Sequence, residues 1–213
     1  MQSRRRMLGV ASLALAVVLA GALEWHKRLA PSLPVLFTLP TFSLVDEQGQ
    51  AFGSAQLAGR PYLADFIYTA CHDACPLLTA RMGELQDLLQ RDPGSVRLVS
   101  FTVDPAHDSP AKLADYARSA RAIPGLWTFV TGPVASVSSL LQDGFKVSVE
   151  APGEAGGEAA GEAKSADAGA RDVSHDGHFV LVDAKGRIRG YFTPSAEGLA
   201  QIRAALKDLL LGV

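Results

Sequence analysis

Short apolar runs alternate with segments of helical periodicity along most of this chain, and this alternation restricts the folds that it can adopt. Three runs are rich in β-branched and aromatic side chains, as expected of interior strands: residues 62–68, 96–103 and 126–130. Between the first two runs, apolar residues recur at spacings of four, three and four, at Leu78, Met82, Leu85 and Leu89. This spacing predicts one apolar face of a helix. Strands that alternate with helices predict an α/β sheet covered on both faces.

Turn and capping signals complete the pattern. Residues 46–49 (DEQG) lie between two short strand-like stretches and predict an N-terminal hairpin, and residues 183–186 (DAKG) predict a second hairpin late in the chain. Ser109 followed by Pro110 predicts the start of a helix. Two further helices are expected, one carrying Val134, Val137, Leu140 and Leu141 and stopped by Gly144, and one capped by Ser195.

Composition indicates one globular domain with appendages. The chain has 213 residues, of which 48% are apolar and 20% are charged, and this balance excludes general disorder. Its two cysteines exclude a disulfide-rich scaffold. Residues 1–30 hold five Lys or Arg and one acid, so the remainder has 15 basic and 21 acidic residues, a net charge of −6. A basic surface for nucleic acid is therefore not expected, and nucleic acid is not an expected partner.

The N-terminal segment is typical of an export or anchoring signal. Three arginines at 4–6 precede the apolar run 7–23, whose 17 residues would form a helix of about 25 Å, close to the thickness of a bilayer core. A cleaved signal peptide and an uncleaved anchor are the two interpretations. We favour the anchor because no polar region follows before Glu24. The predicted organisation is an anchor at 1–29, a tether at 30–40 and a soluble domain at 41–213 in the periplasm.

One segment interrupts the regular pattern. Residues 151–172 contain no large aliphatic or aromatic side chain, so they cannot contribute to a packed core. We interpret them as a mobile acidic insertion. Scattered glutamates among alanine and glycine lack the fixed geometry that a site for a hard cation needs, so we do not predict such a site here.

The chemistry of the chain is concentrated at two cysteines. Residues 71–76 (CHDACP) follow a predicted buried strand and open a predicted helix. Cys71 and Cys75 are four residues apart, which on a helix places their Cα atoms about 6 Å apart, within the range that a disulfide can bridge. A helix N-terminus also favours the thiolate, which is both a nucleophile and a metal ligand. The pair could bind a soft metal, cycle between dithiol and disulfide, or staple the fold.

A third ligand would distinguish these alternatives, and the sequence offers three histidines. His175 and His178 precede a predicted strand, and His72 lies between the cysteines. Spacing alone does not choose among them. A single histidine beside a strand is also common as a surface residue or as a hydrogen-bonded residue of the core.

Three collinear blocks of this sequence resemble the signature blocks of the Sco/SenC copper chaperones, which assist the assembly of cytochrome c oxidase. The blocks are residues 66–76 (FIYTACHDACP), 99–117 (VSFTVDPAHDSPAKLADYA) and 174–192 (SHDGHFVLVDAKGRIRGYF). The resemblance implies a thioredoxin-like fold, an N-terminal membrane anchor, and copper, as Cu(I), Cu(II) or both. It further implies that both cysteines and a histidine eight residues before the LVD aspartate hold this copper.

Counting back from Asp183 identifies that histidine as His175. Asp104 and Pro105 match the Asp-Pro of the family, which implies that they shape the surroundings of the site. Two positions depart from the family pattern. His72 replaces a proline that often follows the first cysteine, and residues 176–178 (DGH) replace a usual start with Ser or Thr. His72 and His178 are therefore candidates for auxiliary or competing ligands.

The expected function is that of a membrane-anchored metallochaperone, and not of an enzyme in the usual sense. The resemblance implies delivery of copper to the binuclear copper site of cytochrome c oxidase, with the copper-bearing oxidase subunit as partner and other copper chaperones or thiol reductants as further partners. The alternative is a thiol-disulfide oxidoreductase that keeps the copper-ligand cysteines of the oxidase reduced, with Cys71 and Cys75 as its redox pair. A peroxidase is disfavoured because no activating arginine can be placed beside either thiol.

Overall fold

The computed structural model describes residues 33–71, 74–92, 94–147 and 177–210. Backbone contacts divide the chain into a main unit, Pro34–Ala204, and a second unit that combines Met1–Leu33 with Ala205–Val213. Several expectations fall outside the described residues: the anchor at 1–29, the insertion at 151–172, His72 and His175. None of the helices within the described ranges is long and apolar enough to cross a membrane.

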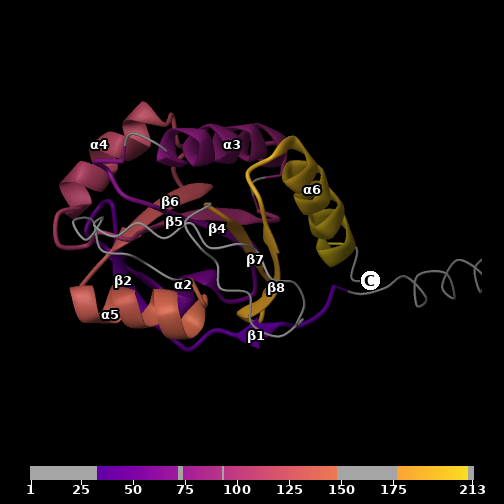
Figure 1. Ribbon diagram of the computed structural model, residues 1–213, viewed down its shortest axis with the longest axis horizontal. Helices are drawn as coiled ribbons and strands as arrows, with labels where there is room; N and C mark the ends of the chain where they lie inside the picture. The colour runs from indigo at the N-terminus through magenta and orange to yellow at the C-terminus, as the bar shows by residue number, and fades with distance from the viewer. Residues whose placement is uncertain (1–32, 72–73, 93, 148–176, 211–213) are drawn as a thin grey trace, which may run out of the picture. The chain divides into compact units, whose positions relative to one another are not determined.

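Strands and helices alternate through the main unit (Figure 1). The elements are, in chain order, β1 (Phe37–Thr38), β2 (Ser43–Asp46), β3 (Ala51–Gly53), α2 (Ser54–Leu57), β4 (Tyr62–Ile67), α3 (Ala74–Leu89), β5 (Arg97–Thr102), α4 (Pro110–Ser119), β6 (Trp127–Thr131), α5 (Val134–Ser139), the π-helix η1 (Leu140–Gly144), β7 (Phe179–Val182), β8 (Arg187–Phe192) and α6 (Ala196–Leu210). The last residues of α6, from Ala205 on, belong to the second unit.

The described strands form one sheet in the order β1-β8-β7-β4-β5-β6-β2-β3. Neighbours β4, β5 and β6 are parallel, whereas β7 is antiparallel to β4 and β8 is antiparallel to β7. A parallel β4–α3–β5 unit with a β7–β8 hairpin on the other side of β4 is the arrangement of the thioredoxin-like fold. The sequence-based expectation of an α/β fold of this kind is confirmed.

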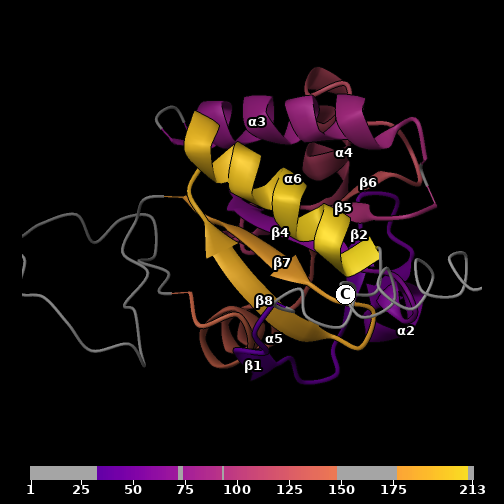
Figure 2. The ribbon, with the colours of Figure 1, turned by 90° about the vertical axis from the view of Figure 1, so that its right-hand side faces the viewer.

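Helices cover both faces of the sheet (Figures 1 and 2). One face carries α3 and α4, with residues 196–204 of α6, and the opposite face carries α2 and α5. Side chains along β4 alternate between these faces. Tyr62 and Ala64 belong to the apolar core on the α5 side, so the alternate residues Leu63 and Asp65 point towards α3 and α4. This alternation places Asp65 under the helices that carry the candidate site.

Local signals predicted most of these elements correctly. The N-terminal hairpin forms around Gly49, which has a φ of 76° that glycine adopts without strain, and the late hairpin forms around Gly186 with a φ of 73°. The Ser109 hydroxyl caps α4 by accepting the backbone N–H of Lys112, and Ser195 caps α6 in the same way. All four predicted inward positions of α3 are buried: Leu78, Met82, Leu85 and Leu89.

The structure departs from the expectations at three places. The expected tether at 30–40 contains the edge strand β1, which pairs with residues of β8 far away in the sequence. The short helix α2 is an element that the sequence pattern does not predict. Val134, expected on an apolar helix face, is 53% exposed, and the helix it opens continues as the π-helix η1 rather than as a regular α-helix. These features depend on tertiary partners, so local spacing carries no signal for them.

Candidate functional site

The two cysteines meet at the turn that joins β4 to α3. The backbone N–H of Cys71 donates to the Tyr68 carbonyl at 3.2 Å, which closes a turn directly after β4. In the first turn of α3, the backbone N–H of Cys75 donates to the Cys71 sulfur at 3.3 Å. Because this N–H belongs to a helix N-terminus, its dipole favours negative charge on that sulfur. The Cys71 sulfur therefore lies beside the backbone of Cys75 at the start of α3.

The two thiols have unequal surroundings. Neither cysteine is in a disulfide, but Cys71 is half-buried and Cys75 is 4% exposed. Burial, and secondly the neighbouring Cys71 sulfur, raise the pKa of the Cys75 thiol well above its usual value. The Cys71 sulfur is therefore the more accessible nucleophile or ligand of the two, and the raised pKa of Cys75 disfavours its thiolate form.

A buried carboxylate holds the turn that carries Cys71. Asp108, which is 1% exposed, accepts the backbone N–H of Thr69 at 3.1 and 3.3 Å and the Thr69 hydroxyl at 2.5 Å. It also accepts the hydroxyl of Thr102, at the end of β5, at 2.5 Å. Asp108 is not among the residues that sequence reasoning singles out. The signal available for it was its place in the block that also contains Asp104.

Asp104 lies on the same loop as Asp108 and is bonded within that loop. Its backbone N–H donates to the Thr102 hydroxyl at 3.0 Å, and its carboxylate oxygens lie 2.8 and 2.9 Å from Nδ1 of the exposed His107. Asp104 is connected to the turn of Cys71 through Asp108, whose backbone N–H donates to the Asp104 carbonyl at 2.9 Å, while its own carboxylate pairs with His107.

Two further polar side chains lie between the sheet and the helices of the site. Asp65 on β4 is fully buried, and neither of its carboxylate oxygens has a hydrogen bond of normal geometry to a described residue. Burial raises the pKa of Asp65 to about 7, although its neighbour Ser100 offsets part of this effect. The Tyr116 hydroxyl of α4 pairs with Thr79 of α3 at 2.7 Å, and burial raises its pKa. Sequence reasoning missed both, although an acid inside an apolar strand is itself a signal.

Gly177, the first described residue before β7, packs against the start of α3. A Cβ atom added to Gly177 would lie 2.3 Å from Cδ1 of Leu78, so the backbone of Gly177 packs directly on this helix residue. Leu78 follows Cys75 by three residues, about one helical turn. His175 and His72 lie outside the described residues, and His178 is partly buried just before β7. Within the described ranges, no third His, Cys, Asp or Glu joins the cysteines in a group that could hold a metal ion.

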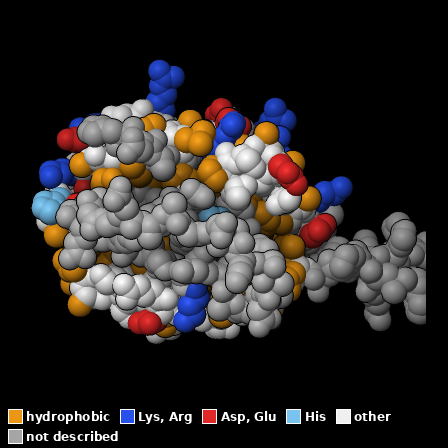
Figure 3. Space-filling model, viewed as in Figure 1, with side chains coloured by type: hydrophobic (Ala, Val, Ile, Leu, Met, Phe, Trp, Pro, Cys, Tyr) orange, Lys and Arg blue, Asp and Glu red, His pale blue; other side chains and the backbone are white. Residues whose placement is uncertain are grey.

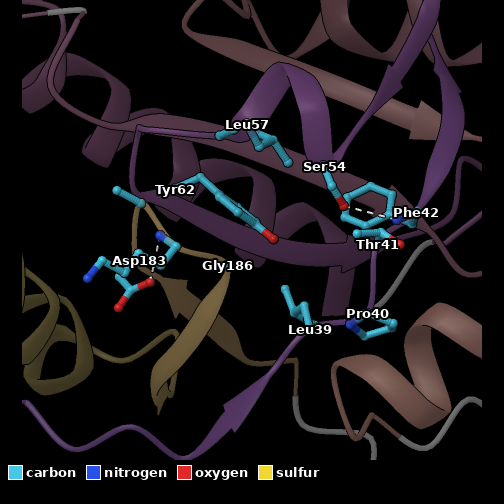
Figure 4. Close-up of a pocket in the computed structure, with 12 residues that line it drawn as sticks. Leu39, Pro40, Thr41, Phe42, Ser54, Leu57, Tyr62, Asp183 and Gly186 are labelled. Atoms are coloured by element: carbon cyan, nitrogen blue, oxygen red, sulfur yellow. Dashed lines mark hydrogen bonds between the residues drawn. The ribbon is translucent and has the colours of Figure 1, made fainter.

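A pocket of about 210 Å³ lies at the other end of β4 (Figure 4). Tyr62 at the start of the strand, Leu39 and Gly186 are among the residues that line it, and its lining contains neither cysteine. The described charges form no single-sign region on the face shown in Figure 3, where Lys and Arg side chains are interspersed with Asp and Glu. The distinctive chemistry of the main unit therefore lies at the start of α3 and not in this pocket.

The fold and the paired sulfurs define a thioredoxin-like dithiol protein. The SCO1/SenC family model matches residues 35–211, and the chain belongs to this family. A SCO1 protein homolog of Bacillus subtilis is 30% identical over 156 residues, which cover 73% of each chain. A protein of Stutzerimonas stutzeri that is named for copper binding is 29% identical over 180 residues. This match covers 83% of this chain and 80% of that protein.

The solved structure of BsSco superimposes with a TM-score of 0.67 at 27% identity, and the match covers 83% of this chain and 95% of BsSco. BsSco is described as a member of the Sco family of cytochrome c oxidase assembly proteins that carries a disulfide switch. The expected family and the thioredoxin-like fold are confirmed by these comparisons.

Proposed function

We propose that this protein is a copper metallochaperone that acts in the assembly of cytochrome c oxidase. The supporting observation is the pair of thiols at the start of α3, where the Cys75 amide contacts the Cys71 sulfur at 3.3 Å and no disulfide joins the two residues. Two thiolates suit Cu(I). With a nitrogen atom as the third ligand, the site could also hold Cu(II). The Stutzerimonas relative supports copper as the cargo, and BsSco supports the assembly role.

His175 is the proposed third ligand. It precedes Gly177 by two residues, and two peptide units place their Cα atoms at most about 7 Å apart. Gly177 packs on Leu78, one turn from Cys75, and this contact supports His175 as the proposed ligand. Copper would then be held by two sulfurs from one turn and an imidazole from a distant segment, which permits stepwise release by ligand exchange.

The test is copper titration of the reduced, full-length chain followed by absorption and paramagnetic-resonance spectroscopy. We expect thiolate-to-copper charge transfer that disappears in Cys71→Ala and in Cys75→Ala, and nitrogen coupling that disappears in His175→Ala. Gly83→Ala is the control, because an added Cβ at this α3 position meets nothing within 4 Å. Unchanged copper affinity in both cysteine variants would refute the proposal.

The delivery role also requires a location. We propose that the apolar run at 7–23 anchors the chain in the cytoplasmic membrane and that the main unit lies in the periplasm, facing the copper-bearing subunit of the oxidase. The arginine cluster at 4–6 supports this orientation. Fractionation of cells that express the full chain, with protease added to intact spheroplasts, tests it. A main unit that stays protected from the protease would contradict the proposed orientation.

A thiol-disulfide oxidoreductase is the second candidate function. The accessible Cys71 with a buried partner suits an attacking and a resolving thiol, and BsSco is described as having a disulfide switch. His175→Ala separates the two functions. Copper delivery should fall strongly in this variant, whereas disulfide exchange measured without copper should be retained. Full delivery by this variant would favour the oxidoreductase.

A further inference from the structure

Asp108 connects two loops that lie beside the sulfurs. Its carboxylate binds the backbone N–H and the hydroxyl of Thr69 on the loop after β4, and the hydroxyl of Thr102 at the end of β5. Its own backbone N–H donates to the Asp104 carbonyl at 2.9 Å. Three donors from Thr69 and Thr102 converge on this one buried carboxylate, so its hydrogen bonds connect the two loops.

This connection acts on the turn that carries Cys71. Thr69 precedes Cys71 by two residues, and the Cys71 N–H closes the same turn onto the Tyr68 carbonyl at 3.2 Å. The turn is therefore held by Asp108 at its start, while the Cys75 N–H contacts the Cys71 sulfur at its end. A shift of Thr69 would move the sulfur relative to this N–H.

The hydrogen bonds of Asp108 go to threonines rather than to sulfur, so any effect on the site passes through Cys71. The contact of the Cys75 N–H favours the Cys71 sulfur in its reduced, thiolate form. An arrangement that keeps this contact in place stabilises the dithiol relative to the disulfide. Loosening the turn should therefore shift the pair towards the disulfide.

We propose that Asp108 is a positioning residue of the sulfur site, whose carboxylate fixes the turn that aims the Cys71 sulfur at the amide of Cys75 and so sets the reduction potential of the pair. This inference rests on the proposed function because it requires the Cys71 sulfur to take part in the chemistry of the site. It concerns copper-free thiol chemistry, so it can be tested even if the chain binds no copper.

The experiment equilibrates the copper-free, full-length chain with glutathione, where the disulfide and two glutathione molecules give the dithiol and glutathione disulfide. In Asp108→Ala we expect the equilibrium constant of this reaction, which forms the dithiol, to fall on the order of tenfold. This fall corresponds to about 30 mV for the two-electron couple. Asp108→Asn should give a smaller fall, because its amide oxygen can still accept the Thr69 N–H.

Thr69→Val removes the hydroxyl contact alone and leaves the backbone contact, so it tests the inference even if Asp108→Ala does not fold. It should shift the same constant in the same direction. The matched control is Asp183→Ala, which removes another buried carboxylate that holds a turn, through Lys185 and Arg187. Asp183 follows β7 at the opposite end of β4 from Cys71, so its loss should destabilise the protein without moving the constant.

The proposed positioning role is overturned if folded Asp108→Asn and Thr69→Val keep the wild-type constant within a factor of two. It is also overturned if Asp183→Ala shifts the constant as far as the Asp108 variants do. Copper titration of the cysteine variants remains a separate readout. A chain that binds no copper but shows the shift refutes the chaperone and supports the role of Asp108.

Discussion

Replacing Asp65 by asparagine should abolish one specific pH dependence of stability. The Asp65 carboxyl has a pKa raised to about 7 by burial, against 3.8 when unperturbed. Between these values the folded state binds a proton that the unfolded state has lost, so the wild type loses stability as the pH rises from about 4 to about 7. A difference of about 3 pH units corresponds to about 4 kcal/mol.

The Asp65→Asn variant has no ionisable group at this position, so this loss is absent and the advantage of the variant should grow with pH. The buried amide has a cost of its own, but that cost does not depend on pH, so the slope is the prediction. Urea unfolding of the full chain from pH 4.5 to 8 measures it. The fluorescence of Trp127 is a local probe, because its Nε1–H donates to the Ser100 hydroxyl at 2.8 Å. Ser100 lies opposite Asp65 in the β4–β5 pair.

The result that refutes this reasoning is an equal pH slope for the wild type and Asp65→Asn. A variant whose advantage shrinks as the pH rises would refute it as well. Either outcome would mean that the Asp65 carboxylate is solvated or paired in the folded protein, and that its position on β4 is not shielded from water.

Three further predictions concern other parts of the molecule. Asp183→Asn should show the opposite pH dependence. Burial alone would raise the pKa of Asp183, but the hydrogen bonds that its carboxylate accepts have the larger effect and lower the pKa. In unfolding experiments the stability lost in the variant should therefore be largest at neutral pH and vanish in acid. Gly177→Ala should destabilise the protein by about 1–3 kcal/mol and weaken copper binding, whereas Gly83→Ala should add about 0.5–1 kcal/mol in thermal unfolding. Iodoacetamide should label Cys71 before Cys75 at pH 8, as peptide mass spectrometry can show, and simultaneous labelling of both would contradict their unequal burial.

Signals contained in a few neighbouring residues predicted much of the fold. The hairpin at residues 46–49 follows from turn residues with glycine last, and the start of α4 follows from a capping serine before proline. The inward face of α3 follows from its spacing. In each case the residues that decide the conformation lie within one or two turns of one another, so no distant partner is needed.

Features that join distant segments were not predictable in this way. β1 exists because Phe37 and Thr38 pair with residues 187 and 188. At the site, Cys71 and Cys75 lie within one turn, where the Cys75 N–H donates to the Cys71 sulfur, while their joint role as ligands or as a redox pair stays a prediction. The bonding of Asp108 required two loops to converge on one carboxylate, and no sequence spacing encodes that convergence. The choice of His175 came from a family resemblance and stays a prediction.

The antiparallel pairing of β7 with β4 determines where any long connection before β7 must arrive. Because Ala64 lies opposite Val180, the start of β7 lies beside the C-terminal end of β4, where the cysteine turn begins. Ladder hydrogen bonds and the contact of Gly177 with α3 fix this entry point, whatever the length of the preceding chain. Loop-closure entropy grows only slowly with length. Residues could therefore be added or removed upstream at small thermodynamic cost, while the entry into β7 keeps its register.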